Sequence, residues 1–434
     1  MNFREHIIST SKKYTTLIHT LAKSAKLNWG LQQDALNTIY KEAILPLMLY
    51  GTPVWIQAME KNCNRTLYSR VQRLMNIKIS KSYRTTSNDA LCILTGNAPI
   101  KIKAEETASI YRITRDKQNQ QLDHKTEPKD WTHPADSIRI CEHNEAKDYT
   151  IRIYTDGSKN EHGVGSGIAI YTKNKLTHQI KHKLHNKCSN NEAEQTAILK
   201  ALHQIETIKL SSNTPRTVKI YTDSSITLSS LKNTKNRKHL IEEVRKKTTA
   251  LEKENWHIQF TWIKAHAGHL GNEMADQLAK EAANNKNMEE TYTKIPKSAI
   301  INELKENSVK QWQREWENTT KGAITKLFFP KIEDRLKLRI TTTPKLTTIT
   351  TGHGNIKSYL YKFKIIDTPQ CDCKNGDQTV EHIIFECTNF DQERDKLKAV
   401  ITRTENWPVS FNKLSTTYRN NFKEFIDTII WDKD

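Results

Sequence analysis

The sequence predicts an α/β protein in which a mixed five-stranded sheet with flanking helices follows an all-α region and precedes a small region containing cysteine and histidine. Two observations predict this fold class. Between residues 148 and 286, short runs rich in Ile, Val, Tyr and Thr alternate with longer runs of helical periodicity. Polar stretches that are poor in aliphatic residues border this region on both sides, as linkers between domains usually do.

Each expected element rests on a local pattern. Leu67, Val71 and Leu74 recur at helical spacing and predict helices before the sheet. The sheet region itself shows three strand-like runs, a helical run, a strand, a second helical run, a strand and a final helix, an order that implies a mixed sheet. The expected boundaries are an all-α region at 1–115, a linker at 116–147, the sheet region at 148–286 and a C-terminal region at 287–434.

Composition narrows the class of partner. The chain of 434 residues has 68 Lys and Arg against 49 Asp and Glu, a formal net charge of +19 that favours nucleic acid as a partner and, second to it, a membrane surface. No run approaches the roughly 18 apolar residues of a membrane-spanning helix, and the N-terminus lacks the apolar core of a signal peptide. We therefore expect an intracellular protein, nuclear or cytoplasmic, that does not insert into a membrane. The 7 cysteines are an odd number, and four of them are scattered, which argues against a disulfide framework.

Three of the strand-like runs end in polar residues: Ile151–Thr155 before Asp156, Val218–Thr222 before Asp223, and Ile258–Ile263 before Lys264 and His266. Because neighbouring strands of an open α/β sheet converge on one rim, residues far apart in sequence can share a site there. Either aspartate alone is more typical of a polar residue that starts a turn than of a functional site. Their repetition in matching contexts favours a shared site.

The helical run that begins at Asn190 offers two candidate acids. Positions on the same face as Glu194 include Ala197, Ile198 and Ala201, so Glu194 belongs to the stripe that faces the sheet. Glu192 lies on a polar face and is interpreted as a partner of the helix N-terminus. A carboxylate on an apolar face is costly unless it is paired or bound to a metal, which favours Glu194 as a ligand.

The last helical run supplies a fourth acid, Asp276. Glu273 lies three residues before it and so on the same helical face. A short glycine-containing loop before this run holds His266 between the last strand and the helix. A loop histidine is often merely solvated, but this position favours a catalytic role.

Together these residues resemble the type I ribonuclease H family in the segments Tyr154–Ser158, Asn190–Glu194, Tyr221–Ser225 and Trp262–Asp276. The resemblance implies a ribonuclease H-like sheet and an enzyme that cuts the RNA strand of RNA–DNA hybrids. By resemblance, two Mg²⁺ ions, with Mn²⁺ as the alternative, are bound by Asp156, Glu194, Asp223 and Asp276. It further implies a catalytic role for His266 and an accessory role for Glu273. The implied contacts with the hybrid are Gly157, Ser158, Asn190 and Asn191, which are small or polar enough to approach a backbone and its 2′-hydroxyls.

The sequence departs from the bacterial form of the family between Asp223 and Trp262, where no room remains for an additional basic helix. A smaller basic cluster lies there, formed by Lys232, Lys235, Arg237 and Lys238. This cluster either substitutes in part for the missing helix or is a solvated helix end.

The N-terminal region resembles the thumb of reverse transcriptases from non-LTR retrotransposons of the Jockey and I type, in the segments 2–7, 46–55, 72–75 and 82–86. A bundle of generic helices is the alternative interpretation. No Tyr/Phe-Ala-Asp-Asp motif of a polymerase occurs in the sequence. We therefore expect no polymerase activity, and we expect the chain to be the C-terminal part of a longer polyprotein.

A zinc-binding segment is expected at 371–387, where Cys371, Cys373, His382 and Cys387 form a C-x-C, H, C set. Three thiolates and one imidazole suit tetrahedral Zn²⁺. The set resembles the segment that follows the polymerase in such elements, except that its first two cysteines are one residue apart rather than two. A fully liganded site leaves no open position, so its expected role is structural.

Two functions follow from the sequence. The first is a hybrid-specific endonuclease that acts in retrotransposon replication. The alternative is a catalytically silent, nucleic-acid-binding remnant of a retrotransposon polyprotein. The complete set of acids favours the first.

Overall fold

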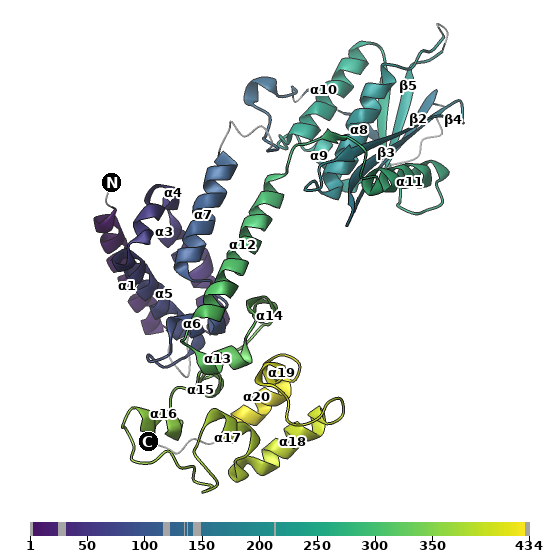
Figure 1. The fold of residues 1–434 in the computed structure, drawn as a ribbon. Helices are drawn as coiled ribbons and strands as arrows, with labels where there is room; N and C mark the ends of the chain where they lie inside the picture. The colour runs from purple at the N-terminus through teal and green to yellow at the C-terminus, as the bar shows by residue number, and fades with distance from the viewer. Residues whose placement is uncertain are drawn as a thin grey trace. The chain divides into compact units, whose positions relative to one another are not determined.

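The computed structural model of the chain describes residues 3–24, 32–115, 122–133, 135–136, 138–141, 149–211 and 214–429 (Figure 1). The chain divides into two compact units. Unit 1 combines Met1–Arg112 with Leu304–Asp434, and unit 2 comprises Ile113–Glu303. None of the described helices is both long and apolar enough to cross a membrane.

Unit 1 is built from helices, which confirms the helical region predicted at the N-terminus. Its first part contains α1 (Arg4–Ser24), α2 (Gln33–Ile39), η1 (Tyr40–Ile44), α3 (Leu45–Leu49), α4 (Thr52–Trp55), η2 (Ile56–Glu60), α5 (Asn62–Ser80), α6 (Asn88–Thr95) and α7 (Ile100–Arg115). Its second part contains α12 (Lys297–Asn318), α13 (Ala323–Phe328), α14 (Ile332–Lys337), α15 (Pro344–Thr351), α16 (Lys357–Lys362), α17 (Val380–Phe385), η4 (Thr388–Phe390), α18 (Asp391–Ile401), α19 (Phe411–Ser415) and α20 (Arg419–Thr428).

The two parts of unit 1 share a hydrophobic core. Cys92, Ile93 and Leu94 of α6 are buried in the same cluster as Trp316 and Phe328 from the second part. Arg335, also from the second part, donates to the carbonyl of Leu94 at 2.5 Å. The sequence did not predict that segments about two hundred residues apart would pack against each other. Apolar periodicity shows that a helix has a buried face but does not show which element packs on it.

Unit 2 is organised around a seven-stranded mixed sheet in the order β1-β6-β5-β2-β3-β4-β7. Its strands are β1 (Ile140–Cys141), β2 (Ile151–Asn160), β3 (Gly163–Thr172), β4 (Lys175–Leu184), β5 (Thr217–Thr222), β6 (His257–Trp262) and β7 (Glu290–Tyr292). The helices are η3 (Pro128–Asp130), α8 (Asn190–Ile205), α9 (Ser225–Lys232), α10 (His239–Lys253) and α11 (Leu270–Asn284). The five predicted strands are β2 to β6, and two short strands that were not predicted extend the edges.

The sheet is antiparallel on one side and parallel on the other. β3 pairs antiparallel with both β2 and β4, while β5 pairs parallel with β2 and β6. The parallel pairing of β2 with β5 ends at Thr155 and Thr222, and that of β5 with β6 ends at Thr222 and Trp262. The residues that follow these three runs therefore meet at one rim, as expected, although β2 itself continues to Asn160 in its pairing with β3.

Helices cover both faces of the sheet. A Cβ built on Gly157 of β2 would lie 2.6 Å from the backbone nitrogen of Glu194, so this position faces α8. A Cβ on Gly167 of β3 would lie 2.1 Å from the carbonyl oxygen of Ala275, so this position faces α11. Glycine at these two places lets a helix backbone contact the sheet directly.

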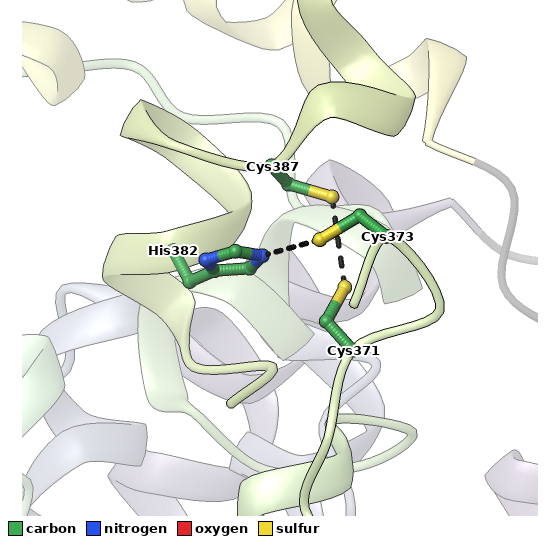
Figure 2. Close-up of side chains that lie close together, drawn as sticks. All are labelled: Cys371, Cys373, His382 and Cys387. Carbon is green, nitrogen blue, oxygen red and sulfur yellow. Dashed lines mark hydrogen bonds between the residues drawn. The ribbon is translucent and has the colours of Figure 1, made fainter. Parts of the chain in front are cut away.

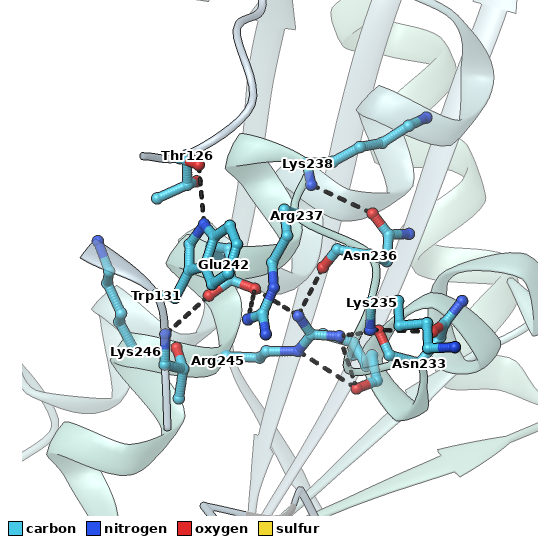
Figure 3. Close-up of polar contacts among 12 residues, drawn as sticks. Thr126, Trp131, Asn233, Lys235, Asn236, Arg237, Lys238, Glu242, Arg245 and Lys246 are labelled. Atoms are coloured by element: carbon cyan, nitrogen blue, oxygen red, sulfur yellow. Dashed lines mark hydrogen bonds and ion pairs between the residues drawn. The ribbon is translucent and has the colours of Figure 1, made fainter. Parts of the chain in front are cut away.

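Much of the predicted linker lies outside the described residues, but residues 122–133, here called the strap, are described. The strap is hydrogen-bonded to unit 2: Asp123 N donates to Ile295 O at 2.9 Å, and Thr126 N donates to Arg237 O at 3.0 Å. The Trp131 indole lies over the Arg237 guanidinium, 4.3 Å from the ring centroid. The strap thus fastens the loop between α9 and α10 (Figure 3).

A buried charge network completes this loop. Glu242 is buried and accepts from Arg237 at 3.0 Å, from the backbone of Thr132 at 3.0 Å and from Arg245. Arg245 also donates to loop carbonyls, at 2.8 Å to Asn233 and 2.7 Å to Asn236 (Figure 3). Arg237 is therefore not a solvated helix end, because its guanidinium is held by Glu242 and Trp131.

Candidate active site

Asp156 and Asp223 lie side by side because of strand register. Thr155 of β2 pairs with Thr222 of the neighbouring parallel strand β5. The next residue of each chain segment, Asp156 and Asp223, therefore lies at the same level of the rim. Asp156 is buried, and the Gly157 amide donates to its carboxylate at 2.6 Å. Asp223 is partly buried, and its carbonyl accepts from the Trp262 indole at 3.0 Å.

Glu194 reaches the same rim from the first turn of α8. This helix begins with a capping box in which Ser189 and Glu192 satisfy each other's backbone groups, which agrees with the interpretation of Glu192 as an N-terminal partner. The close contact between Gly157 and the backbone of Glu194 then brings that turn against β2. Asn190 Nδ2 donates to Glu194 Oε1 at 2.8 Å, and Ser224 forms a second hydrogen bond with the same carboxylate.

Asp276 arrives from the opposite face of the sheet. Asp156 is paired in register with Gly167, and the backbone of Ala275 packs on that glycine. Asp276, the next residue of α11, is thereby held beside Asp156. Lys280 lies one turn further along the helix and forms an ion pair with Asp276 at 2.6 Å.

The four carboxylates interact electrostatically. Burial raises the pKa of Asp156 to about 8, with further contributions from the negative charges of Asp223, Asp276 and Glu194. Burial is also the main cause that raises the pKa of Glu194 and the pKa of Asp223. A cluster in which Asp156, Glu194 and Asp223 resist ionisation is suited to divalent cations, which favour carboxylate oxygens and would offset this repulsion.

The structure brings His266 to this cluster but leaves it exposed. Its backbone has a left-handed φ of 50° in the loop before α11. It is near enough to Asp223 that its positive charge would lower the pKa of that carboxylate, against the larger effect of burial. Glu273 is exposed on the first turn of α11.

The predicted nucleic-acid contacts border the same rim. Gly157 and Ser158 follow Asp156 in β2, and Asn190 and Asn191 open α8. Asn190 is exposed, whereas Ser158 and Asn191 are partly buried. Gly157 is buried against α8, so its contribution is the close approach of β2 to that helix rather than an exposed contact.

Sequence reasoning missed two residues that orient the acids. Asn272 is buried in α11 and its side chain is hydrogen-bonded to Asp223, and Ser224 is buried and hydrogen-bonded to Glu194. A signal existed, since Ser224 directly follows an acid and Asn272 lies one helical turn before Asp276. Helical spacing alone could not reveal that Asn272, on α11, is hydrogen-bonded to Asp223, which follows β5.

A second group of ligating side chains lies in unit 1. The ligand atoms of Cys371, Cys373, His382 and Cys387 all lie within 4.8 Å of one another (Figure 2). Cys371 Sγ is 3.6 Å from Cys387 Sγ, and Cys373 Sγ is 3.1 Å from His382 Nε2. This group could hold zinc. The short C-x-C spacing still allows the thiols of Cys371 and Cys373 to lie close to the other two ligand atoms.

Local structure places these four ligands. Cys371 N donates to Gly376 O at 2.8 Å, which closes a tight turn in which Lys374 and Gly376 have positive φ. Thr379 caps α17, which carries His382, and Cys387 N donates to His382 O at 2.7 Å at the end of this helix. Burial raises the pKa of Cys373, but hydrogen bonds from Asn375, His382 and the other two thiols outweigh it and lower the pKa to about 6. A thiolate at neutral pH is what a metal requires.

Comparisons with known proteins match the sheet-containing part of the chain. The family model described as RNase H matches residues 148–284. The ribonuclease H of Vibrio campbellii is 30% identical over 156 residues, which cover 32% of this chain and 94% of that protein. A Pol polyprotein of the type-1 retrotransposable element R1 from Nasonia vitripennis is 32% identical over 104 residues, 24% of this chain, and the chain spans only 26% of the length of that polyprotein. Ribonuclease H1 of Halobacterium salinarum aligns in structure with a TM-score of 0.25 at 18% identity, covering 30% of this chain and 96% of that one.

Proposed function

Because this chain belongs to the ribonuclease H family through residues 148–284, we propose that it hydrolyses the RNA strand of RNA–DNA hybrids with two Mg²⁺ ions held by Asp156, Glu194, Asp223 and Asp276. The observation that carries the proposal is the convergence of these acids from β2, α8, β5 and α11 at one rim. Burial and neighbouring negative charge raise the pKa values of Asp156, Glu194 and Asp223, and bound cations would offset this cost of ionisation.

Bound Mg²⁺ or Mn²⁺ would activate water and stabilise the charge of the scissile phosphate. The chain's own residues provide the frame for this chemistry. Asn190 and Ser224 fix the Glu194 carboxylate, and Asn272 fixes Asp223, so the acids are oriented before any ion arrives. Lys280 neutralises Asp276 until it is displaced.

His266 is assigned the proton transfer at the leaving 3′ oxygen. An exposed imidazole on a loop beside Asp223 can reach a substrate and can donate or accept a proton there. Glu273, exposed on the neighbouring helix turn, is assigned an accessory role in the same step.

Selectivity for a hybrid is assigned to the residues that border the acids. The exposed amide of Asn190, with Asn191 and Ser158, can donate to and accept from 2′-hydroxyls of the RNA strand. Similarity to R1 polyproteins supports a role in retrotransposon replication, where the template RNA must be removed after complementary DNA is made.

The decisive experiment incubates the purified chain with labelled RNA–DNA hybrid, duplex DNA and duplex RNA, with and without Mg²⁺. Cleavage of the RNA strand of the hybrid alone, dependent on Mg²⁺ and lost in Asp223→Asn, is the expected result. A chain that binds the hybrid without cutting it under any of these conditions would support the silent remnant instead.

The Cys/His group is proposed to be a structural zinc site. Its test is metal analysis of the purified chain beside Cys373→Ser, with Cys63→Ser as the matched control because Cys63 is an exposed cysteine outside the group. We expect about one equivalent of zinc in the wild type and the control, and much less in Cys373→Ser. An unchanged zinc content in Cys373→Ser would remove this residue from the ligand set.

A further inference from the structure

Two surface segments of unit 1, far apart in sequence, lie against each other. His353 Nδ1 is 3.1 Å from the Thr85 hydroxyl, and the Thr347 hydroxyl donates to the carbonyl of Lys81 at 3.4 Å. The ring of Tyr83 lies directly over Gly354, where a Cβ would be 2.3 Å from the ring. The loop after α5 and the segment around α16 therefore form one continuous surface.

Aromatic rings run across this surface. The ring centroids of His353 and Tyr359 are 4.6 Å apart, and those of Tyr359 and Phe363 are 4.9 Å apart. Phe363, at the end of this row, is 56% exposed. Two further rings are open to solvent: Tyr83, which packs on Gly354, is 42% exposed, and Tyr361, two residues before Phe363, is 49% exposed. Exposed aromatic rings that gather in one place usually mark a binding surface.

Cations alternate with these rings. Lys81 and Arg84 flank Tyr83, while Lys362 and Lys364 flank Phe363, and all four are exposed. None of these four cations forms an ion pair within the part of the chain that the structure describes. The nearby Asp372 is already paired with Lys357 at 2.5 Å, and Asp367 is the one acid between residues 357 and 370.

The electrostatic environment within the row agrees with this distribution. Burial lowers the pKa of His353, and the positive charges of Arg73 and Lys362 lower it further. The α5 side and the α16 side thus each bring a cation close to the same imidazole. A surface with two sources of positive charge favours an anionic partner.

We propose that this aromatic–basic surface, formed by Tyr83, Tyr361 and Phe363 with Lys81, Arg84, Lys362 and Lys364, binds a single strand of nucleic acid. Bases stack on the exposed rings, and the lysines and Arg84 contact the phosphates. Only unpaired bases offer their faces to protein rings, so a fully paired duplex should bind here more weakly. The surface lies in unit 1 and adds a binding function to hybrid cleavage by unit 2.

The test measures fluorescence anisotropy of the full chain with labelled single strands of about 15 nucleotides, oligo(U) and oligo(dT), and with a blunt duplex of equal length. Tyr361→Ala with Phe363→Ala should weaken binding of both single strands by about tenfold or more. Lys362→Gln with Lys364→Gln should reduce the slope of log affinity against log salt by about 1.4, since each phosphate contact contributes about 0.7.

The controls match each change in chemistry. Tyr50→Ala removes another exposed tyrosine of unit 1, and Lys305→Gln with Lys310→Gln removes two exposed lysines of α12. Neither control should alter binding, and Tyr361→Phe should keep it. Because Phe363 packs on Tyr359, Tyr361→Ala alone serves as the variant that leaves the ring row intact.

The outcomes separate the alternatives. If the aromatic variants bind both oligo(U) and oligo(dT) more weakly, the surface is a general single-strand site. If they lose affinity for oligo(U) alone, the surface is an RNA site. Both outcomes support the proposal. Unchanged affinity in the aromatic variants, or duplex binding as tight as single-strand binding, would overturn it. Hybrid cleavage by the same variants should stay at the wild-type rate, so a failure here is distinct from failure of the proposed nuclease.

Discussion

Asp156 is the residue where burial and like charge act together most strongly. In the metal-free protein, burial and the three neighbouring acids raise the pKa of this carboxyl from its ordinary value near 4 to about 8. The folded state therefore holds a proton that the unfolded state releases. This contribution to stability is fully present below about pH 4 and is lost progressively as the pH rises through 8.

Replacing Asp156 with Asn should remove this pH dependence. In Mg²⁺-free buffer at pH 8 we expect the variant to be more stable than the wild type by the order of 1 kcal/mol, and we expect no hybrid cleavage. Thermal unfolding between pH 4 and 8 measures the effect, with Glu161→Gln, an exposed acid of unit 2, as the control. Parallel stability curves for Asp156→Asn and the wild type would contradict the prediction.

We expect Asn272 to act on the proposed reaction through Asp223. Its buried side chain donates a hydrogen bond that lowers the pKa of Asp223 against the effect of burial. In Asn272→Ala we expect hybrid cleavage to fall by about 10–100-fold and half-saturation by Mg²⁺ to need more metal.

A pH profile distinguishes this positioning role from simple destabilisation. Without the hydrogen bond, the pKa of Asp223 rises, so the acid limb of the rate profile of Asn272→Ala should move to higher pH. Gln277→Ala changes an exposed amide of the same helix and should leave the limb in place. An acid limb that does not move in Asn272→Ala would refute the assignment.

The contact between β3 and α11 is the element-scale feature on which the site depends. Gly165 and Gly167 of β3 leave no side chain between the strand and the helix backbone, so α11 settles directly on the sheet. Asp276 is one residue beyond the closest contact. The position of α11 on the sheet therefore sets the position of Asp276, the proposed metal ligand.

Gly167→Ala tests that dependence. The added methyl group would lie 2.1 Å from the carbonyl oxygen of Ala275, so α11 must shift. We expect a loss of about 1–3 kcal/mol in the free energy of unfolding and a loss of cleavage even well below the melting temperature. Thr172→Ala, near the end of the same strand, should retain activity. Full activity in a folded Gly167→Ala protein would show that Asp276 does not need this packing.

The strap shows how composition and tertiary contacts can differ. Its polar sequence is typical of a linker, yet its described residues pair with Ile295, with Arg237 and with Glu242 from three separate parts of unit 2. Trp131 is the residue that could have indicated docking, since a large aromatic ring is rare in a flexible linker. Its partner, Arg237, could not be inferred from spacing.

At the scale of the whole molecule, unit 1 is discontinuous. Residues 1–112 and 304–434 contribute to one buried cluster that contains Leu94, Trp316 and Phe328. The sheet-containing unit is inserted between them in sequence. The stability of either part should therefore depend on the other.

Separate expression tests this dependence. Residues 1–112 and 304–434, produced as two chains in one cell, should copurify because their shared core has no other way to be covered. Placing a charge in that core with Phe328→Asp should abolish copurification, whereas Leu327→Asp changes an exposed neighbour and should not. Two parts that remain soluble and separate would contradict a single unit.

The sequence by itself determined the five central strands of the sheet, the rim at which the polar residues converge and the Cys/His group at 371–387. These features follow from local periodicity and from residue types whose chemistry is specific. The assignment of Glu192 to the helix N-terminus and of Glu194 to the sheet face came from helical spacing alone, and the placement in the structure agrees.

Tertiary structure alone decided which distant segments meet. The shared core of unit 1, the strap, the two edge strands and the orientation of Asp223 by Asn272 all depend on pairs of residues that are separated along the chain. Apolar and polar patterns predict that one face of an element will be buried. They do not predict which other element buries it, because burial is favourable against any complementary surface. The physical reason is that hydrophobic burial has no direction, whereas register, close backbone contact and hydrogen bonds exist only once the partner is in place.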